Sequence, residues 1–227
     1  MAPGRGVPAI SYLNRFLEPA ESLAEILFGL IMVLTCTLGA SLLAGIDREG
    51  LRTTLLAALG CNIAWGIIDA ALYVMGNVFV RSRNRRLMLA VRAAPDDATA
   101  LALVRDALEP QLEAHGREKD REQFYRSLRG IVVNDKLAPV AITMDDLRSA
   151  VAVFVLVVAS ALPSAAAFFL ISDPQLALRV SNVVQVILLF VVGFYWARSI
   201  GANGWWTGLT LMLSGVLLVG IAIPLGG

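Results

Sequence analysis

Histidine and cysteine are scarce in this sequence, which has one of the first and two of the second. With His115 as the single histidine, no Cys/His zinc site can be assembled. Cys36 and Cys61 both fall inside apolar segments, where two small buried residues are more common than a structural disulfide. A phosphate-binding loop, a nucleophile elbow and a metalloprotease motif are also missing. We therefore expect neither an enzyme nor a permanently bound cofactor.

Charge is sparse as well, at 16% of the residues with a net charge of +1, so nothing suggests nucleic acid as a partner. Hydrophobic residues instead make up 57% of the chain, and the mean hydropathy is +0.71. They gather in five blocks, each near the roughly 20 helical residues that cross a bilayer. The blocks are residues 24–45, 54–79, 149–172, 177–197 and 205–225. The sequence predicts an all-α polytopic membrane protein with five transmembrane helices, embedded in a lipid bilayer.

The blocks divide the chain into four segments. These are an amino-terminal segment with an interfacial helix (1–23), transmembrane helices 1 and 2 (24–81), a helical cytoplasmic insert (82–147) and transmembrane helices 3 to 5 (148–227). Four proline positions set expected boundaries, because proline fits a first helical turn and breaks an interior. Pro19 is expected to begin the first span, Pro95 to precede an insert helix, Pro110 to open a second one, and Pro163 to kink span three.

Basic residues are distributed unequally across the membrane. Of the 19 Lys and Arg, 13 lie between Arg81 and Arg148, and simple alternation of the spans puts 16 on one side against Arg48, Arg52 and Arg179 on the other. The positive-inside rule then places the amino terminus and residues 82–147 in the cytoplasm and the carboxyl terminus outside. Arginine outnumbers lysine 17 to 2, which is typical of a GC-rich bacterial genome. The expected location is the inner (plasma) membrane.

Asp69 is the only ionisable acid or base well inside an apolar block. A carboxylate at that depth costs about 3 kcal/mol to insert, so it takes up a proton, binds a cation or accepts hydrogen bonds from neighbouring helices. Asn62, Tyr73 and Asn77 are spaced by seven, four and four residues with Asp69 and share its helical face. The stripe predicts either a transport pathway or hydrogen-bonded contacts between helices.

The first block carries a second stripe at helical spacing. Glu21 and Glu25 lie at its cytoplasmic end, and Met32 and Cys36 lie deeper. Such a graded series could attract and then hold a borderline divalent ion such as Fe²⁺. The alternative is a solvated helix start followed by ordinary packing.

The insert contains 11 carboxylates and 11 basic residues. Glu109 and Glu113 belong to an acidic group that could gather metal ions. Arginines are interleaved with that group, and the pairs Glu113–Arg117 and Glu122–Arg126 have the i,i+4 spacing of helical ion pairs. The pattern favours a salt-bridged, solvated face and weak metal binding.

Two short runs resemble the vacuolar iron transporter family. Residues 25–35 are similar to the start of the family's first span, where an acidic residue precedes a Phe-Gly pair, and residues 69–79 are similar to its second. Glu25, Phe28, Gly29 and Gly76 fit those patterns. Three positions depart from them: Met32 stands where the family usually has Asp, Tyr73 where it has Met, and Asn77 where it has Glu.

The resemblance implies a homodimer with its pathway between the first two helices of the subunits, and exchange of cytosolic Fe²⁺ or Mn²⁺ for protons. Asp69 would be the proton-coupled carboxylate. The remaining candidates are the metal ligands Glu21, Glu25, Glu109 and Glu113 and the pathway residues Met32, Cys36, Asn62, Tyr73 and Asn77. The alternative is a membrane scaffold that retains the fold without transporting metal.

Overall fold

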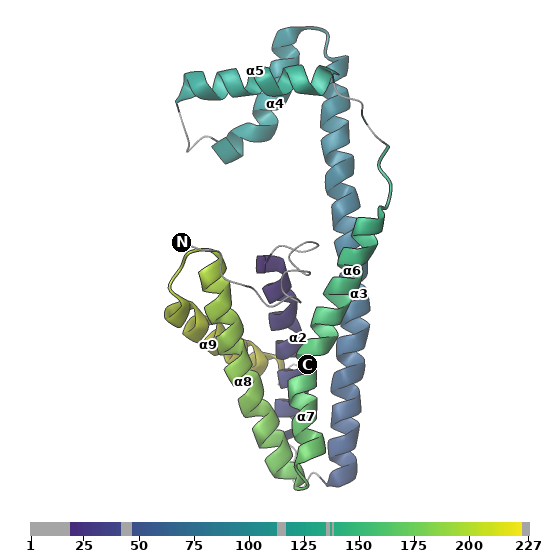
Figure 1. Ribbon diagram of the computed structural model, residues 1–227, viewed down its shortest axis with the longest axis vertical. Coiled ribbons are helices and arrows are strands. Elements are labelled where there is room, and N and C mark those ends of the chain that lie inside the picture. Colours follow the sequence, from purple (N-terminus) through teal and green to yellow (C-terminus); the bar gives the residue numbers. More distant parts are fainter. Residues whose placement is uncertain (1–18, 42–46, 113–116, 135–136, 138, 224–227) are drawn as a thin grey trace, which may run out of the picture. The chain divides into compact units, whose positions relative to one another are not determined.

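The structure is a computed structural model that describes residues 19–41, 47–112, 117–134, 137 and 139–223 (Figure 1). Its regular elements are all helices: α2 (Pro19–Ser41), α3 (Arg48–Ala93), α4 (Asp97–Leu112), α5 (Glu118–Asn134), α6 (Met144–Ser160), α7 (Leu162–Leu170), α8 (Pro174–Ser199) and α9 (Gly204–Ala222). Five spans are long and apolar enough to cross a membrane: Glu21–Ala40, Arg48–Ala93, Met144–Leu170, Pro174–Ser199 and Gly204–Ile221. The predicted all-α membrane fold with five spans is confirmed.

The chain forms two compact units. The membrane unit comprises Met1–Tyr73 and Met144–Gly227, and the insert unit comprises Val74–Thr143. Helix α3 contributes to both, because it continues without a break to Ala93, beyond the apolar block that ends at residue 79. Residues 80–93 contain neither glycine nor proline, so nothing in the sequence stops the helix before Pro95.

Proline marks three helix starts in the membrane unit. Pro19 begins α2, and Pro174 begins α8 directly after Asp173, whose carboxylate accepts a hydrogen bond from the Leu176 amide at 2.7 Å. Pro163 lies in the first turn of α7, so span three is interrupted at Ala161 between α6 and α7. The expected effect of Pro163 on this span is confirmed, because a proline ring cannot continue the hydrogen-bond ladder of the preceding helix.

The expectation for Pro110 was wrong. Helix α4 passes through Pro110 and ends at Leu112, so this proline does not open a new helix. Pro110 lies on the exposed side of the last turn. There the missing N–H removes a single hydrogen bond near the end of the helix.

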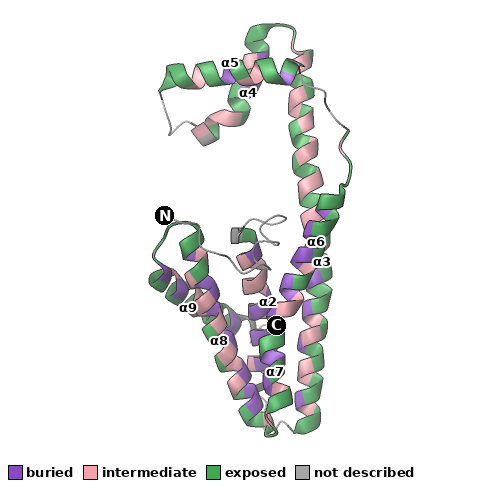
Figure 2. Ribbon diagram, viewed as in Figure 1, coloured by how far each residue is buried: buried purple, intermediate pink, exposed green. Residues whose placement is uncertain are grey.

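Helix α2 packs against α6, α8 and α9 in the membrane unit. The largest cluster of buried side chains there joins Leu30 and Leu34 of α2 to Leu189 and Val192 of α8 and Val219 of α9. Figure 2 shows buried residues along α2 and α8, whereas α3 is mostly half-buried or exposed. Much of the apolar surface of α3 is therefore left for lipid or for another protein surface.

A layer of uncharged polar side chains interrupts this apolar core. Thr37, Ser181 and Gln185 are 0% exposed and Ser164 is 1% exposed. On α8, Ser181 and Gln185 fall between the cluster that contains Leu178 and the cluster that contains Leu189. Among the described residues, Ser164 Oγ, Ser181 Oγ and both amide atoms of Gln185 have no hydrogen-bond partner. Unsatisfied polar groups of this kind destabilise a fold.

We expect Gln185→Met to raise the free energy of unfolding by about 1 kcal/mol, because a thioether of similar shape removes two unsatisfied buried atoms. Thermal unfolding in detergent measures the change. Gln175→Met, at the exposed start of α8, is the matched control and should leave the unfolding temperature unchanged. A lower unfolding temperature for Gln185→Met alone would contradict the expectation.

The insert unit has its own apolar core, built from Val91 of α3, Ala100 and Val104 of α4, and Tyr125 and Val132 of α5. Polar contacts around it tie the three helices together. Arg92 Nε donates to the Val132 carbonyl at 2.8 Å, and Arg129 pairs with Asp97 at 2.5 Å.

The start of α4 follows the predicted signal. Asp96 precedes the helix, and its carboxylate accepts a hydrogen bond from the Thr99 amide at 2.8 Å. That bond stabilises the charged form and lowers the pKa of Asp96 below its ordinary value.

Candidate metal pathway

Helices α2 and α3 run antiparallel and touch at a few side-chain contacts. The rings of Phe28 and Trp65 pack edge to face, with centroids 5.6 Å apart. Further along, Val33 of α2 and Ala58 of α3 belong to one buried cluster. Residue numbers thus rise on α2 as they fall on α3, as expected for a hairpin. We call this line the α2–α3 seam; it carries Glu21, Glu25, Phe28, Met32 and Cys36 on α2 and Cys61, Trp65 and Asp69 on α3.

A three-helix junction fixes α3 beside α2. Asn62 is 0% exposed, and its Nδ2 donates to the carbonyls of Gly29 at 3.4 Å and Val157 at 3.2 Å. A Cβ atom on Gly29 would lie 2.8 Å from the backbone carbonyl oxygen of Val157 and closer still to Ser160 Oγ of α6, so only glycine fits there. These hydrogen bonds join Asn62 to two neighbouring helices, as expected if the polar stripe serves helix packing. A role for Asn62 in a transport pathway stays a prediction.

The carboxylates predicted on separate helices come near one another in the membrane unit. Glu25 is half-buried and within electrostatic range of both Asp69 and Glu21. Asp69 is also half-buried, and its Oδ2 atom is buried without a hydrogen-bond partner among the described residues. Like charges this close in an apolar span repel, so the group favours a proton or a cation.

Sulfur atoms occupy the next part of the seam. Met32 and Cys36 are half-buried on α2, and Cys36 packs against the cluster that contains Val33 and Ala58. Cys61 of α3 is half-buried too and lies within electrostatic range of Cys36. The sequence predicted Cys61 only as a small buried residue, without a place in the pathway. Its spacing of four residues from Trp65 and eight from Asp69 is the signal that could have found it.

The two remaining pathway candidates lie in different units. Tyr73 is half-buried at the end of the membrane unit and packs against a cluster formed by Ala152, Val153 and Leu156 of α6. Asn77 belongs to the insert unit, where it is half-buried. Tyr73 therefore helps to hold α3 against α6.

The acidic residues of the insert are engaged by basic and phenolic groups. Glu109 accepts a hydrogen bond from the Tyr125 hydroxyl at 2.8 Å and pairs with Arg121 at 3.5 Å. Glu122 pairs with Arg105 and, at 3.3 Å, with Arg126, as its spacing predicted. Hydrogen bonding from Arg105 lowers the pKa of Glu122 below its ordinary value. Glu113 lies outside the described residues.

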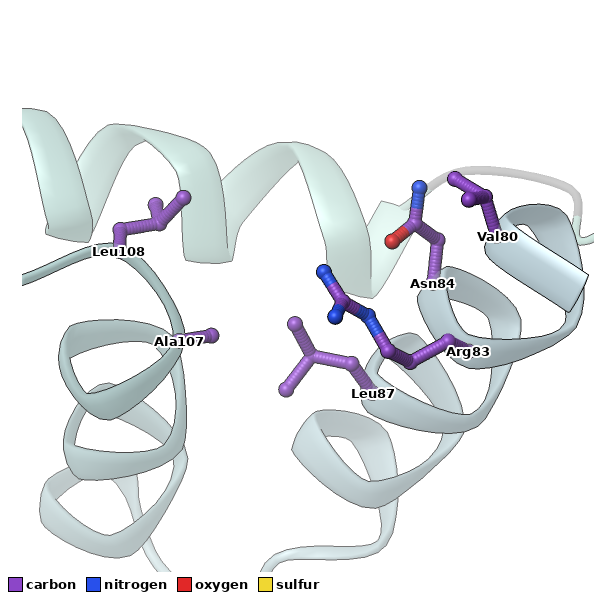
Figure 3. A pocket seen from close by; sticks show the side chains of 6 residues that line it. All are labelled: Val80, Arg83, Asn84, Leu87, Ala107 and Leu108. Carbon is purple, nitrogen blue, oxygen red and sulfur yellow. The ribbon is translucent and has the colours of Figure 1, made fainter. Parts of the chain in front are cut away.

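A pocket of about 590 Å³ lies between α3 and α4 of the insert unit (Figure 3). Arg83 and Leu87 extend into it from α3 toward Ala107 of α4. Val80, Asn84 and Leu108 complete its lining, so it contains an arginine and no carboxylate. This pocket does not suit a metal cation.

We expect the isolated insert unit to bind Fe²⁺ and Mn²⁺ only weakly, because Glu109 and Glu122 are already ion-paired with Arg121 and Arg105. Titration calorimetry on residues 74–143 measures this. The double variant Arg105→Gln/Arg121→Gln removes one ionic partner from each carboxylate and leaves Glu122 with Arg126 and Glu109 with Tyr125. It should bind at least about tenfold more tightly, since each charge-assisted bond removed is worth more than about 1 kcal/mol. Tight, stoichiometric binding by the unaltered insert would contradict the expectation.

Comparison with known proteins completes the description of the site. A model of the VIT family, VIT1, matches residues 82–227, which is more than half of the chain. The chain belongs to the VIT family. The predicted membership of the vacuolar iron transporters is confirmed, and with it the class of multi-pass membrane proteins that transport metal ions. A search of curated proteins finds no match.

The matched residues cover the insert and the last three spans, but not α2 or most of α3. The α2–α3 seam lies outside the matched residues.

Proposed function

We propose that this VIT protein moves a divalent metal ion out of the cytoplasm in exchange for protons, along the α2–α3 seam. Fe²⁺ and Mn²⁺ are the substrates that the resemblance to the family implies. The observation that carries the proposal is Asp69, a carboxylate in an apolar span with an unpartnered buried oxygen, beside Glu25 and Glu21. No packing contact of the described residues accounts for that oxygen.

The negative charges of these carboxylates allow them to exchange protons for a metal ion. Glu25 and Asp69 repel each other as ionised carboxylates in an apolar span, so this pair favours the uptake of protons when no cation is present. An arriving divalent ion favours the ionised forms and displaces those protons. Glu21 and Glu25 would receive the ion at the cytoplasmic end of α2, and Asp69 would pass it on and take up a proton from the other side.

A homodimer is part of the proposal. Among the described residues of one chain, no group of three or more His, Cys, Asp or Glu side chains is arranged to hold a metal ion. Exposed apolar side chains of α3 lie on the face beside the seam, with Ile68 at 43% and Leu72 at 55%. A second copy packed on this face would cover them and bring a second set of carboxylates to the ion.

The proposed orientation places the insert in the cytoplasm of the cell, inside the inner (plasma) membrane. A cysteine introduced by His115→Cys, with Cys36 and Cys61 replaced by serine, should stay unlabelled by an impermeant maleimide in intact cells and react after permeabilisation. The 16 to 3 distribution of basic residues is the reason. Labelling of this cysteine in intact cells would show that the insert lies outside the cell and would contradict the proposed orientation.

Flux into proteoliposomes tests the proposal directly. Purified protein with an imposed pH gradient should carry Fe²⁺ or Mn²⁺, and collapse of the gradient should slow the flux. The second candidate is a membrane scaffold without transport, which the packing bonds of Asn62 and the ion-paired insert favour. Flux no faster than in empty liposomes, for every ion tested, would establish that candidate instead.

A further inference from the structure

We propose that the pocket between α3 and α4 of the insert unit binds an anionic phospholipid, with Arg83 holding the lipid phosphate. None of the pocket residues belongs to the α2–α3 seam, and the inference goes beyond the proposed function because it requires no metal transport. A lipid bound in this pocket ties the insert unit to the surface of the bilayer.

The pocket is formed by two helices of the same unit. Its lining residues on α3 share one helical face, and two residues of α4 complete it (Figure 3): Val80, Arg83, Asn84 and Leu87 on α3, and Ala107 and Leu108 on α4. The volume of about 590 Å³ falls within the range of about 300–1,000 Å³ that is typical of sites for small molecules. Four of the six side chains are apolar, so the pocket suits a phosphate group joined to carbon atoms.

The only charge in the lining is positive. The guanidinium group of Arg83 extends into the pocket, and it forms no hydrogen bond or ion pair with any described residue. Guanidinium N–H donors form a fixed fork that matches two oxygens of a phosphate. Asn84 adds a neutral amide to the same lining. The polar part of the pocket therefore suits an anion that accepts several hydrogen bonds.

The position of the pocket along α3 favours a lipid as the source of the phosphate. The apolar block of this helix ends at residue 79, and Val80 is the next residue. Arg83 lies four residues, or about 6 Å, beyond the block. The headgroup layer of a bilayer extends about 5–7 Å beyond the hydrocarbon core on each side. Helix α3 thus carries Arg83 at the depth where phospholipid phosphates lie.

Neighbouring arginines favour an anionic lipid over a zwitterionic one. Arg81, Arg85 and Arg86 lie within three residues of Arg83 on α3. Arg81 donates to the Ala141 carbonyl at 3.2 Å, a bond that leaves its positive charge uncompensated. Basic residues that cluster at the end of a membrane helix attract anionic headgroups. These arginines concentrate anionic lipid around the pocket, and the pocket provides a defined site for one molecule.

Lipid binding to the purified full-length protein tests the site. In native mass spectrometry, dioleoyl phosphatidylglycerol should bind tightly at one molecule per chain, and dioleoyl phosphatidylcholine, with the same acyl chains, should bind more weakly. Arg83→Gln should weaken phosphatidylglycerol binding at least about tenfold, because it removes charge-assisted bonds to the phosphate. Arg86→Gln, the matched control, removes the same charge from an exposed position of α3 outside the lining and should weaken binding by a smaller factor.

A second variant occupies the pocket and leaves every charge in place. Ala107→Phe adds a ring to the lining and should also weaken phosphatidylglycerol binding. Ala102→Phe, at another exposed position of α4, is its control and should bind as the unaltered protein does. Arg83 and Ala107 are both exposed, so we expect these variants to fold, and thermal unfolding in detergent checks this.

Three outcomes would overturn the lipid site. Equal binding of the two lipids, or equal losses for Arg83→Gln and Arg86→Gln, would show only a general attraction of basic residues to anionic headgroups. Displacement of phosphatidylglycerol by millimolar inorganic phosphate would show a site for soluble phosphate. These measurements involve no metal flux, so the failure of the lipid site leaves the proposed function intact. Likewise, an absence of metal flux into proteoliposomes leaves the lipid site intact.

Discussion

Asp69→Asn is expected to reduce metal flux into proteoliposomes to the level of empty liposomes and to remove its dependence on a pH gradient. Asparagine has nearly the same shape as aspartate but can neither release a proton nor contribute a negative charge. The apolar span gives the carboxylate no compensating cation among the described residues, so its charge is available for exchange. Fe²⁺ and Mn²⁺ flux with and without the gradient measures the effect.

Stability decides how a loss of flux is interpreted. The free energy of unfolding of Asp69→Asn should equal or exceed that of the unaltered protein, because a neutral amide is less costly to bury than a carboxylate. Asp106→Asn, at an exposed position of the insert unit, is the matched control and should leave both flux and stability unchanged. Unchanged transport by Asp69→Asn would exclude the exchange role, and a collapse of its stability would favour helix packing instead.

The five spans were predictable because hydropathy reports directly on transfer into lipid. Apolar blocks of the right length became α2, α3, α6 with α7, α8 and α9, and Pro163 divided the third span as proline chemistry requires. Boundaries near charged residues were less predictable. The second apolar block ends at residue 79, whereas α3 continues to Ala93. The arginines that follow the block end the apolar span, but arginine is a good helix former and does not end the helix.

The candidate site was predictable only in part. Helical spacing along a single segment identified Glu25, Met32 and Cys36 on α2 and Asp69 on α3. This spacing can be recognised without knowing which helix packs beside the segment. Which residues of two helices face each other depends on how the helices pack. The junction of Asn62 with Gly29 could therefore not be distinguished from a pathway contact.

Gly208→Ala is expected to destabilise the membrane unit by about 1–3 kcal/mol, as overpacking of a close contact does. Glycines at three positions of α9 face large side chains of α8, which lets the two helices approach closely. A Cβ atom on Gly208 would lie 2.9 Å from the backbone carbonyl oxygen of Phe190 and 3.0 Å from its ring. A ring can turn aside, but a backbone oxygen moves only if α8 moves with it.

Gly220→Ala, in the same helix, provides the matched control. A Cβ atom there would meet no other atom within 4 Å, so only the helix propensity changes, which favours alanine by about 1 kcal/mol. Thermal unfolding in detergent should therefore shift in opposite directions for the two variants. A higher unfolding temperature for both variants would show that α8 and α9 have room to separate. The close packing at the glycines of α9 would then not hold the two helices together.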